Sequence, residues 1–261
     1  MGILNVTPDS FSDGGAYLDP ASARRRLDEI VREGAAICDV GAESTRPGAR
    51  PVPLDEELRR LAPVFDAMVD GDIGPVSIDT TKAQVAERAM DCGALLVNDV
   101  TAGRGDTRML PLIAERGRAV CLMHMRGAPL TMQDAPRYRD VVGEVAAFLE
   151  QRLDAALSCG ISEDNILLDP GIGFGKRLED NLALIRGLPQ LAALGRPLVV
   201  GSSRKRMFAQ LLGRDDPGDR LAGSLAAALF SVQSGVAVVR VHDVVQTVDA
   251  LATWRAIEEA S

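Results

Sequence analysis

The chain has 261 residues, of which 46% are hydrophobic and 25% charged, and its formal net charge is −8. This size and composition suit one large α/β domain or two smaller ones, and they argue against a disordered, collagen-like or coiled-coil protein. No apolar run approaches the ~20 residues of a membrane span, no basic apolar leader precedes Met1, and the acidic balance argues against nucleic acid, so we expect a cytoplasmic protein with neither partner.

Short apolar runs alternate with longer amphipathic segments along the whole chain. Runs that are apolar on both faces are typical of strands in a buried parallel sheet. The predicted strands, in chain order, are 3–6, 36–40, 76–79, 95–98, 119–123, 166–169, 198–200 and 236–241.

The segments between these runs carry a helical period. Asp19 followed by Pro20 is typical of a helix start. The apolar stripes are Leu27, Ile30 and Val31; then Leu54, Leu58, Leu61, Phe65 and Met68; and, near the end, Val244, Val248 and Leu251. Pro63 lies inside the second stripe, and we expect it to kink or restart that helix.

Eight strand–helix alternations in about 250 residues predict one α/β domain, 1–261, built as a single (β/α)8 TIM barrel. Periodicity does not reveal whether a sheet closes, so a doubly wound open sheet is the structural alternative. The cysteines Cys38, Cys92, Cys121 and Cys159 form no CxxC pair, and we expect reduced structural thiols rather than a zinc or disulfide framework.

In a barrel, functional side chains gather where strands end and the following loops begin. Polar residues recur at nearly every predicted strand end: Asn5, Asp79, Asn98, His124, Asp169, Ser203, Lys205, Arg240 and His242. One such residue is explained by helix capping or a turn. Their recurrence indicates a site.

The segment 171–176 resembles a phosphate-binding loop but fits neither common fingerprint. A GxGxxG pattern needs glycine where Lys176 stands, and a P-loop needs glycine at Pro170 and serine or threonine at Arg177. The glycines more simply permit a tight loop beside a flat ligand, to which Phe174 offers a ring face. The alternative for Phe174 is an ordinary core position.

Motifs along the whole chain together resemble those of dihydropteroate synthases. They are MGILNVTPDSFSDGG at 1–15, DVGAESTRPG at 39–48, SIDT at 77–80, VNDV at 97–100, MHM at 123–125, LDPGIGFGK at 168–176, GSSRK at 201–205 and RVHD at 240–243. The resemblance implies condensation of 6-hydroxymethyl-7,8-dihydropterin diphosphate with 4-aminobenzoate, giving 7,8-dihydropteroate and pyrophosphate by a dissociative, Mg²⁺-assisted substitution.

The same motifs imply where the pterin binds. Its contacts are implied to be Asp79, Asn98, Met123, Asp169, Phe174, Gly201 and Lys205. A carboxylate suits a pterin because the amino group and the adjacent ring N–H form a two-donor edge. Turn capping is the alternative for the polar members, and it has little weight for Asp169, which Pro170 follows.

The remaining site residues are also implied by the resemblance. Those for pyrophosphate are Asn5, Arg46, Arg240 and His242, with Asn5 also linked to Mg²⁺. Those for 4-aminobenzoate are Phe11, Thr45, Pro47, Ser203 and Arg206, the last standing where many relatives have serine. The catalytic set is Asp13, Arg46, Asp169 and Lys205. An aniline nitrogen is uncharged at neutral pH, so catalysis depends on electrostatics and positioning rather than on a strong base.

The sequence departs from the family pattern at two places. Ala42 stands where glycine is common, which implies strain if that position has positive φ. The match begins at Met1, whereas relatives usually have a lead-in that closes the barrel bottom, so we expect lower stability there. The family also implies a homodimer and sulfonamide sensitivity.

Three other functions stay open from the sequence. They are a methyltetrahydrofolate methyltransferase-like barrel, a non-catalytic pterin-binding paralogue and a sugar-phosphate barrel enzyme.

Overall fold

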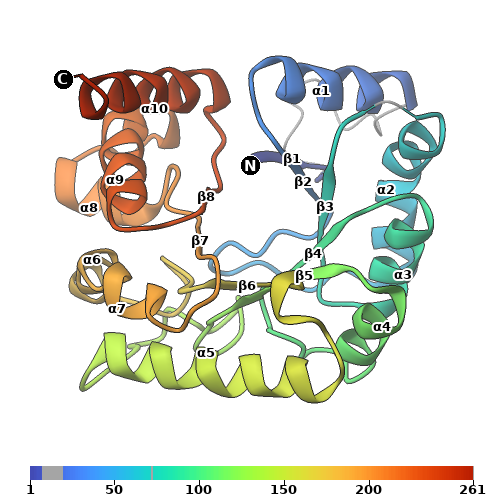
Figure 1. Ribbon diagram of the computed structural model, residues 1–261, viewed down its shortest axis with the longest axis horizontal. Helices are drawn as coiled ribbons and strands as arrows, with labels where there is room; N and C mark the ends of the chain where they lie inside the picture. Colours follow the sequence, from blue (N-terminus) through green and yellow to red (C-terminus); the bar gives the residue numbers. More distant parts are fainter. Residues whose placement is uncertain (8–19, 72, 261) are drawn as a thin grey trace.

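The computed structural model describes residues 1–7, 20–71 and 73–260. Strands and helices alternate in it: β1 (Gly2–Asn5), α1 (Pro20–Arg32), β2 (Cys38–Gly41), α2 (Leu54–Val69), β3 (Val76–Asp79), α3 (Ala83–Asp91), β4 (Leu96–Asp99), α4 (Met109–Arg116), β5 (Ala119–Met123), α5 (Val141–Ser158), β6 (Ile166–Asp169), α6 (Leu178–Arg186), α7 (Leu188–Ala192), β7 (Val199–Val200), α8 (Arg206–Leu212), α9 (Leu221–Gln233), β8 (Val238–Val239) and α10 (Val244–Glu258). The helices form a ring around the strands, with α10 next to α1 (Figure 1).

The strands are all parallel and form a closed barrel. β1 to β6 pair in sequence order, and β7 pairs with β8. A bridge between Leu168 and Leu198 joins β6 to the residue before β7, and a bridge between Gly2 and Val241 joins β1 to the segment after β8. The predicted TIM barrel is therefore confirmed, and the open sheet is excluded.

The predicted strand bounds agree best with the structure where the hydrogen-bonded ladder between strands is regular. β3, β5 and β6 have the predicted bounds, while β7 and β8 are only 2 residues each. At this seam the N–H groups of Ala237 and Val238 both donate to the carbonyl of Leu198, at 3.1 and 3.0 Å. A local irregularity of this kind shortens a ladder without removing the buried apolar run that predicted it.

Most stripe residues face the barrel as predicted, but Val31 and Val248 are exposed and Pro63 does not restart its helix. Leu27 and Ile30 of α1 are fully buried, but Val31 is 37% exposed. The expected restart at Pro63 is wrong, since α2 continues through it. Pro63 removes one backbone donor, whereas Leu61 and Phe65 on either side are buried against the core, and this packing offsets the lost hydrogen bond.

The cysteines are free thiols within the described part of the chain, three of them buried: Cys38, Cys92 and Cys121, with Cys159 exposed. Burial raises the pKa of the Cys38 thiol to about 12, so that it remains protonated at neutral pH. Among the described helices, none combines the length and apolar character needed to cross a bilayer.

Candidate active site

A cavity of about 1040 Å³ opens at the carboxyl ends of the strands. Asn5 and Asp79 are the last residues of β1 and β3, while Gly201 and Arg240 directly follow β7 and β8. All four line the cavity, because parallel strands in a barrel bring their carboxyl ends to one face.

Most of the residues proposed from the sequence share this cavity. Those that line it are Asn5, Thr45, Arg46, Pro47, Asp79, Phe174, Gly201, Ser203, Lys205, Arg206, Arg240 and His242. Asn98, Met123 and Asp169 do not line it and are buried at the adjoining ends of β4, β5 and β6. Phe11 and Asp13 lie outside the described residues.

Arg240 is held between two acidic side chains on the barrel interior. Its Nε donates to Oδ2 of Asp39 at 2.6 Å, and its Nη2 donates to Oδ2 of Asp79 at 2.8 Å. Burial raises the pKa of Asp79 to about 7 against the opposing effect of Arg240, and nearby Asp39 and Asp99 raise it further. Asp79 is therefore poised to change charge near neutrality.

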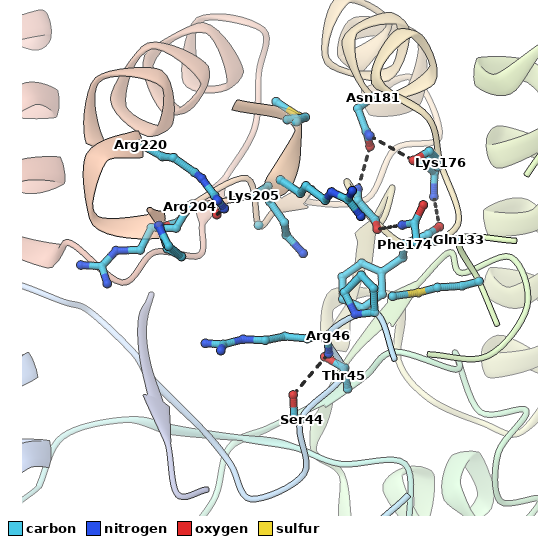
Figure 2. A pocket seen from close by; sticks show the side chains of 18 of the residues that line it. Ser44, Thr45, Arg46, Gln133, Phe174, Lys176, Asn181, Arg204, Lys205 and Arg220 are labelled. Atoms are coloured by element: carbon cyan, nitrogen blue, oxygen red, sulfur yellow. Dashed lines mark hydrogen bonds between the residues drawn. The ribbon is translucent and has the colours of Figure 1, made fainter. Parts of the chain in front are cut away.

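Lys205 extends into the cavity beside an aromatic ring. Its Nζ lies 4.1 Å from the centroid of Phe174 (Figure 2). Burial lowers the pKa of Lys205 to about 8, the positive charge of Arg240 acts in the same direction, and Asp169 opposes both. Gly173 has a φ of 85°, and a Cβ there would lie 3.1 Å from Cδ of Lys205, so glycine allows the lysine to pass close to the loop.

The loop after β6 is fixed by its own polar groups. Oδ1 of Asp169 accepts from the N–H of Gly171 at 2.7 Å, so the turn-capping role, which Pro170 made less expected, is present. Burial raises the pKa of Asp169 in spite of this bond. Lys176 is buried beneath the loop and donates to the carbonyls of Gly171 and Phe174, at 2.9 and 3.1 Å.

The loop between β2 and α2 contributes a second cation. The side chain of Arg46 extends toward the same open space as Lys205, from the opposite wall (Figure 2). The base of this loop is anchored, since Lys82 bonds to Glu43 and Arg60 donates to the carbonyl of Ala42 at 2.9 Å. Ala42 is buried and is not among the residues with positive φ, so its replacement of glycine introduces no strain there.

His242 lies at the edge of the cavity as a neutral group. Burial lowers its pKa to about 4, and the charges of Arg240 and Arg204 lower it further. Its Nδ1 lies 3.1 Å from Oγ of Ser203, which also accepts from the backbone N–H of His242 at 3.1 Å. At neutral pH this side chain offers hydrogen bonds rather than positive charge.

Comparisons with known proteins identify the family of this site. A family model described as "Pterin binding enzyme" matches residues 1–242. The dihydropteroate synthase of Neisseria meningitidis serogroup B is 46% identical over 98% of this chain and 92% of the relative, and that of Escherichia coli K12 is 44% identical over 96% and 88%. The chain belongs to the dihydropteroate synthase family.

Solved structures of the dihydropteroate synthase family agree with the fold. The Xanthomonas albilineans enzyme with 4-aminobenzoic acid has a TM-score of 0.92 and 46% identity, covering 100% of this chain and 93% of that one. The Thermus thermophilus enzyme in complex with 6HMPPP has a TM-score of 0.84 and 48% identity, covering 98% and 93%. This chain therefore shares both its fold and much of its sequence with solved dihydropteroate synthases.

Several cavity residues of this synthase family member were not found from its sequence. Gln133 lines the cavity and donates from Nε2 to the carbonyl of Gly173 at 2.8 Å (Figure 2). Arg220 lines it as well and donates to the carbonyl of Arg204 at 2.9 Å. Neither residue follows a strand or belongs to a matched motif, and their sequence neighbourhoods carry no signal for the site.

The residues present are compatible with Mg²⁺ held mainly by substrate. No group of three or more His, Cys, Asp or Glu side chains in the described ranges is arranged to hold a metal ion. Asn5 places an amide, with one oxygen donor, at the cavity wall. Magnesium prefers oxygen ligands and commonly keeps waters and substrate phosphates in its shell, so a single protein oxygen fits that arrangement.

Proposed function

We propose that this cavity carries out the dihydropteroate synthase reaction with the residues assigned below. The chain is a transferase of this class, which joins 6-hydroxymethyl-7,8-dihydropterin diphosphate to 4-aminobenzoate and releases pyrophosphate. The observation that carries the residue assignment is the juxtaposition of a buried carboxylate with two cations in one cavity, Asp79 beside Arg240 and Lys205. A nitrogen heterocycle with an anionic diphosphate needs both.

The pterin is assigned to the carboxylate side of the cavity. Asp79 and Asp169 accept from its two-donor edge, and Asn98 and Lys205 supply further hydrogen bonds. Phe174 covers one face of the ring. Gly201 allows close approach at the barrel mouth, and Met123 forms an apolar wall, as supported by its packing with Met132 against Phe174.

The diphosphate is assigned to the cationic side, at Asn5, Arg46, Arg240 and His242. Nε and Nη2 of Arg240 already donate to carboxylates, which offset most of its charge. Arg46 reaches the cavity from an exposed loop without such a partner among the described carboxylates. We therefore assign Arg46 the larger share of the negative charge that develops on the leaving group.

Magnesium is proposed as the cofactor, held by Asn5 and by the diphosphate itself. When bound, it supplies positive charge to the leaving-group oxygens. The protein's own part is to place Arg46 and His242 beside those oxygens. Removal of Mg²⁺ with a chelator is expected to weaken binding of the diphosphate substrate, whereas binding of a pterin without phosphates is unchanged. Equal binding of the diphosphate with and without chelator would remove Asn5 from this role.

The chemical step is proposed to be dissociative. The bond between the exocyclic carbon and the diphosphate oxygen breaks, its electron pair leaves with pyrophosphate, and the cationic carbon is stabilised by the electron-rich dihydropterin. The nitrogen of 4-aminobenzoate then attacks that carbon, and its proton passes to pyrophosphate or solvent water. Lys205 has a pKa of about 8 and is mostly protonated at neutral pH, so it acts as a cationic hydrogen-bond donor.

The second substrate is assigned to the space between the loop after β2 and the segment after β7. Thr45 and Pro47 line the cavity from that loop, Ser203 from the loop after β7, and Arg206 from the first residue of α8. Arg206 is exposed, so it can reach the carboxylate of 4-aminobenzoate. Phe11 and Asp13 remain predictions for the aminobenzoate pocket and for catalysis.

The wider organisation is also proposed. Residues 1–261 act as one domain, and the buried free thiols support a cytoplasmic location.

A homodimer through the barrel helices is supported by the exposed Phe230 on α9. Light scattering coupled to gel filtration tests it, because Phe230→Asp should convert a dimer to a monomer, and a monomeric parent protein would reject it.

Pyrophosphate release from the purified protein tests the proposed function. The substrates are the dihydropterin diphosphate and Mg²⁺, with and without 4-aminobenzoate. Release that requires 4-aminobenzoate and yields dihydropteroate supports the synthase. Absence of release together with calorimetric binding of a pterin would instead identify a non-catalytic paralogue.

A further inference from the structure

Asp39 is a buried residue of β2 that does not line the cavity, yet it contacts two residues of the site. Its Oδ2 accepts from Nε of Arg240 at 2.6 Å and from Nδ2 of Asn98 at 3.1 Å. The Asp39 side chain is fully buried. One carboxylate oxygen therefore holds side chains from β4 and from the segment after β8, on two sides of the barrel.

The contact with Asp39 fixes the direction of the Asn98 amide. A carboxylate oxygen only accepts hydrogen bonds, so the end of the amide that faces Asp39 must be its NH2 group. The amide oxygen of Asn98 is then turned away from Asp39. An acceptor in that direction suits a ring edge that offers N–H groups, whereas the reversed amide would repel it.

The same carboxylate limits the positions open to Arg240. With Nε on Asp39 and Nη2 on Asp79, two nitrogens of the guanidinium are held at once by different carboxylates. Asp79 receives this one hydrogen bond on Oδ2 and lines the cavity. The orientation of the Asp79 carboxylate toward a ligand thus depends on Arg240, and Arg240 depends on Asp39.

We propose that Asp39 is a positioning residue of the pterin pocket, which orients the Asn98 amide and the Arg240 guanidinium without touching substrate. The inference rests on the proposed function, because the pocket that it orders is the proposed pterin site.

Substitutions at Asp39 can separate the loss of its negative charge from the loss of its hydrogen-bond acceptor. Within the described ranges Oδ1 has no hydrogen-bond partner, and neither has Oγ of Ser77, the register partner of Asp39 on β3. An asparagine at 39 can present its amide oxygen at the Oδ2 position and its NH2 group toward Ser77. Asp39→Asn therefore keeps the acceptor and removes the charge, whereas Asp39→Leu removes both. Ser77→Ala is the matched control, since it changes a fully buried side chain in the same layer whose hydroxyl, among the described residues, hydrogen-bonds to neither Asn98 nor Arg240.

Steady-state kinetics of these three variants test the inference. For Asp39→Leu we expect KM for the dihydropterin diphosphate to rise by about tenfold, because buried donors lose their acceptor, while KM for 4-aminobenzoate changes by less than about twofold. For Asp39→Asn the rise is expected to be about threefold, and for Ser77→Ala less than about twofold. An Asp39→Leu protein as active as Ser77→Ala would overturn the inference.

A pH profile gives a readout that a purely structural role would not move. The charged groups around Asp79 are Arg240, Lys205, Asp39, Asp99 and Glu57, and the negative charge of Asp39 raises the pKa of Asp79. In Asp39→Asn the acid limb of the pterin KM profile should therefore shift to lower pH. If Asp39→Leu fails to fold, this shift decides the matter, and an unmoved limb in folded Asp39→Asn overturns the proposal. Absence of turnover in the parent protein would instead contradict the proposed function.

Discussion

The ammonium of Lys205 lies 4.1 Å from the centre of the Phe174 ring, although the two residues belong to different loops at the barrel mouth. The lysine comes from the loop after β7 and the phenylalanine from the loop after β6. The ring thus stabilises a cation whose pKa burial lowers. This pair joins the proposed pterin site to the cationic side of the cavity.

Phe174→Leu is expected to raise KM for the dihydropterin diphosphate by about fivefold, since a cation–π contact and a ring face are lost, worth about 1 kcal/mol together. Steady-state pyrophosphate release measures it. Phe230→Leu is the control, because Phe230 is 45% exposed on α9. Equal KM values in the two variants would show that the Phe174 ring does not contact substrate.

Lys205→Ala is expected to lower kcat by roughly 100-fold, because a preorganised cation in the cavity is removed. The neighbouring Arg206→Ala should instead raise KM for 4-aminobenzoate and leave kcat within about twofold. Both variants should retain the far-ultraviolet circular dichroism of the parent. A kcat for Lys205→Ala equal to that of the parent would contradict the assignment of the lysine.

The sequence predicted those parts of the fold and site that are encoded locally. Buried apolar runs located β3, β5 and β6, and the motifs located most of the cavity wall. Closure of the barrel depends on the bridge of Gly2 to Val241, which no local period contains. Asp39 stood inside a matched motif, but its partners lie 59 and 201 residues away, so its contacts were not predictable from spacing.

Continuation of α2 through Pro63 also escaped prediction, because a local rule assigns the proline a cost and says nothing of the buried neighbours that offset it. The turn-capping bond of Asp169 was also not expected, and it is present in the structure. Pro170 removes the nearest donor, but the next residue, Gly171, adopts positive φ and supplies its N–H instead. The first case was decided by the packing around the proline, and the second by the glycine two residues after Asp169.

Asp79→Asn is expected to stabilise the protein at pH 8 while it weakens pterin binding. The pKa of Asp79 is raised from its ordinary value to about 7 in the folded state, so between these values the folded chain holds more protons than the unfolded chain. The contribution of this group to stability therefore falls as pH rises through that window. An amide removes the buried charge, and the melting temperature at pH 8 should rise by at least about 2 °C, with little change at pH 4.

Thermal melts of Asp79→Asn and the parent at both pH values test the expected change in stability. Arg240 retains Asp39 as a partner in the variant, so the cation is not left alone. A lower melting temperature for the variant at pH 8 would show that the bond from Arg240 outweighs the burial of the carboxylate.

Lys176→Met is expected to loosen the loop that carries Phe174 and to change how stability depends on pH. Burial lowers the pKa of Lys176 to about 7, and its Nζ donates to the carbonyls of Gly171 and Phe174. Between about 7 and the ordinary value near 10.5 the folded chain holds fewer protons than the unfolded chain, so this group makes stability rise with pH. The variant lacks that rise and leaves carbonyls without a donor, at a cost of about 1–3 kcal/mol.

Urea unfolding of the parent and of Lys176→Met at pH 7 and pH 9 measures the difference, which should be larger at pH 9. Arg255→Met, at an exposed position on α10, is the control for loss of a cation and should show no such dependence. Because the loop also frames Lys205, KM for the dihydropterin diphosphate should rise in Lys176→Met at either pH. A stability difference that is the same at both pH values would mean that Lys176 stays protonated in the folded protein, held by the carbonyl oxygens around it.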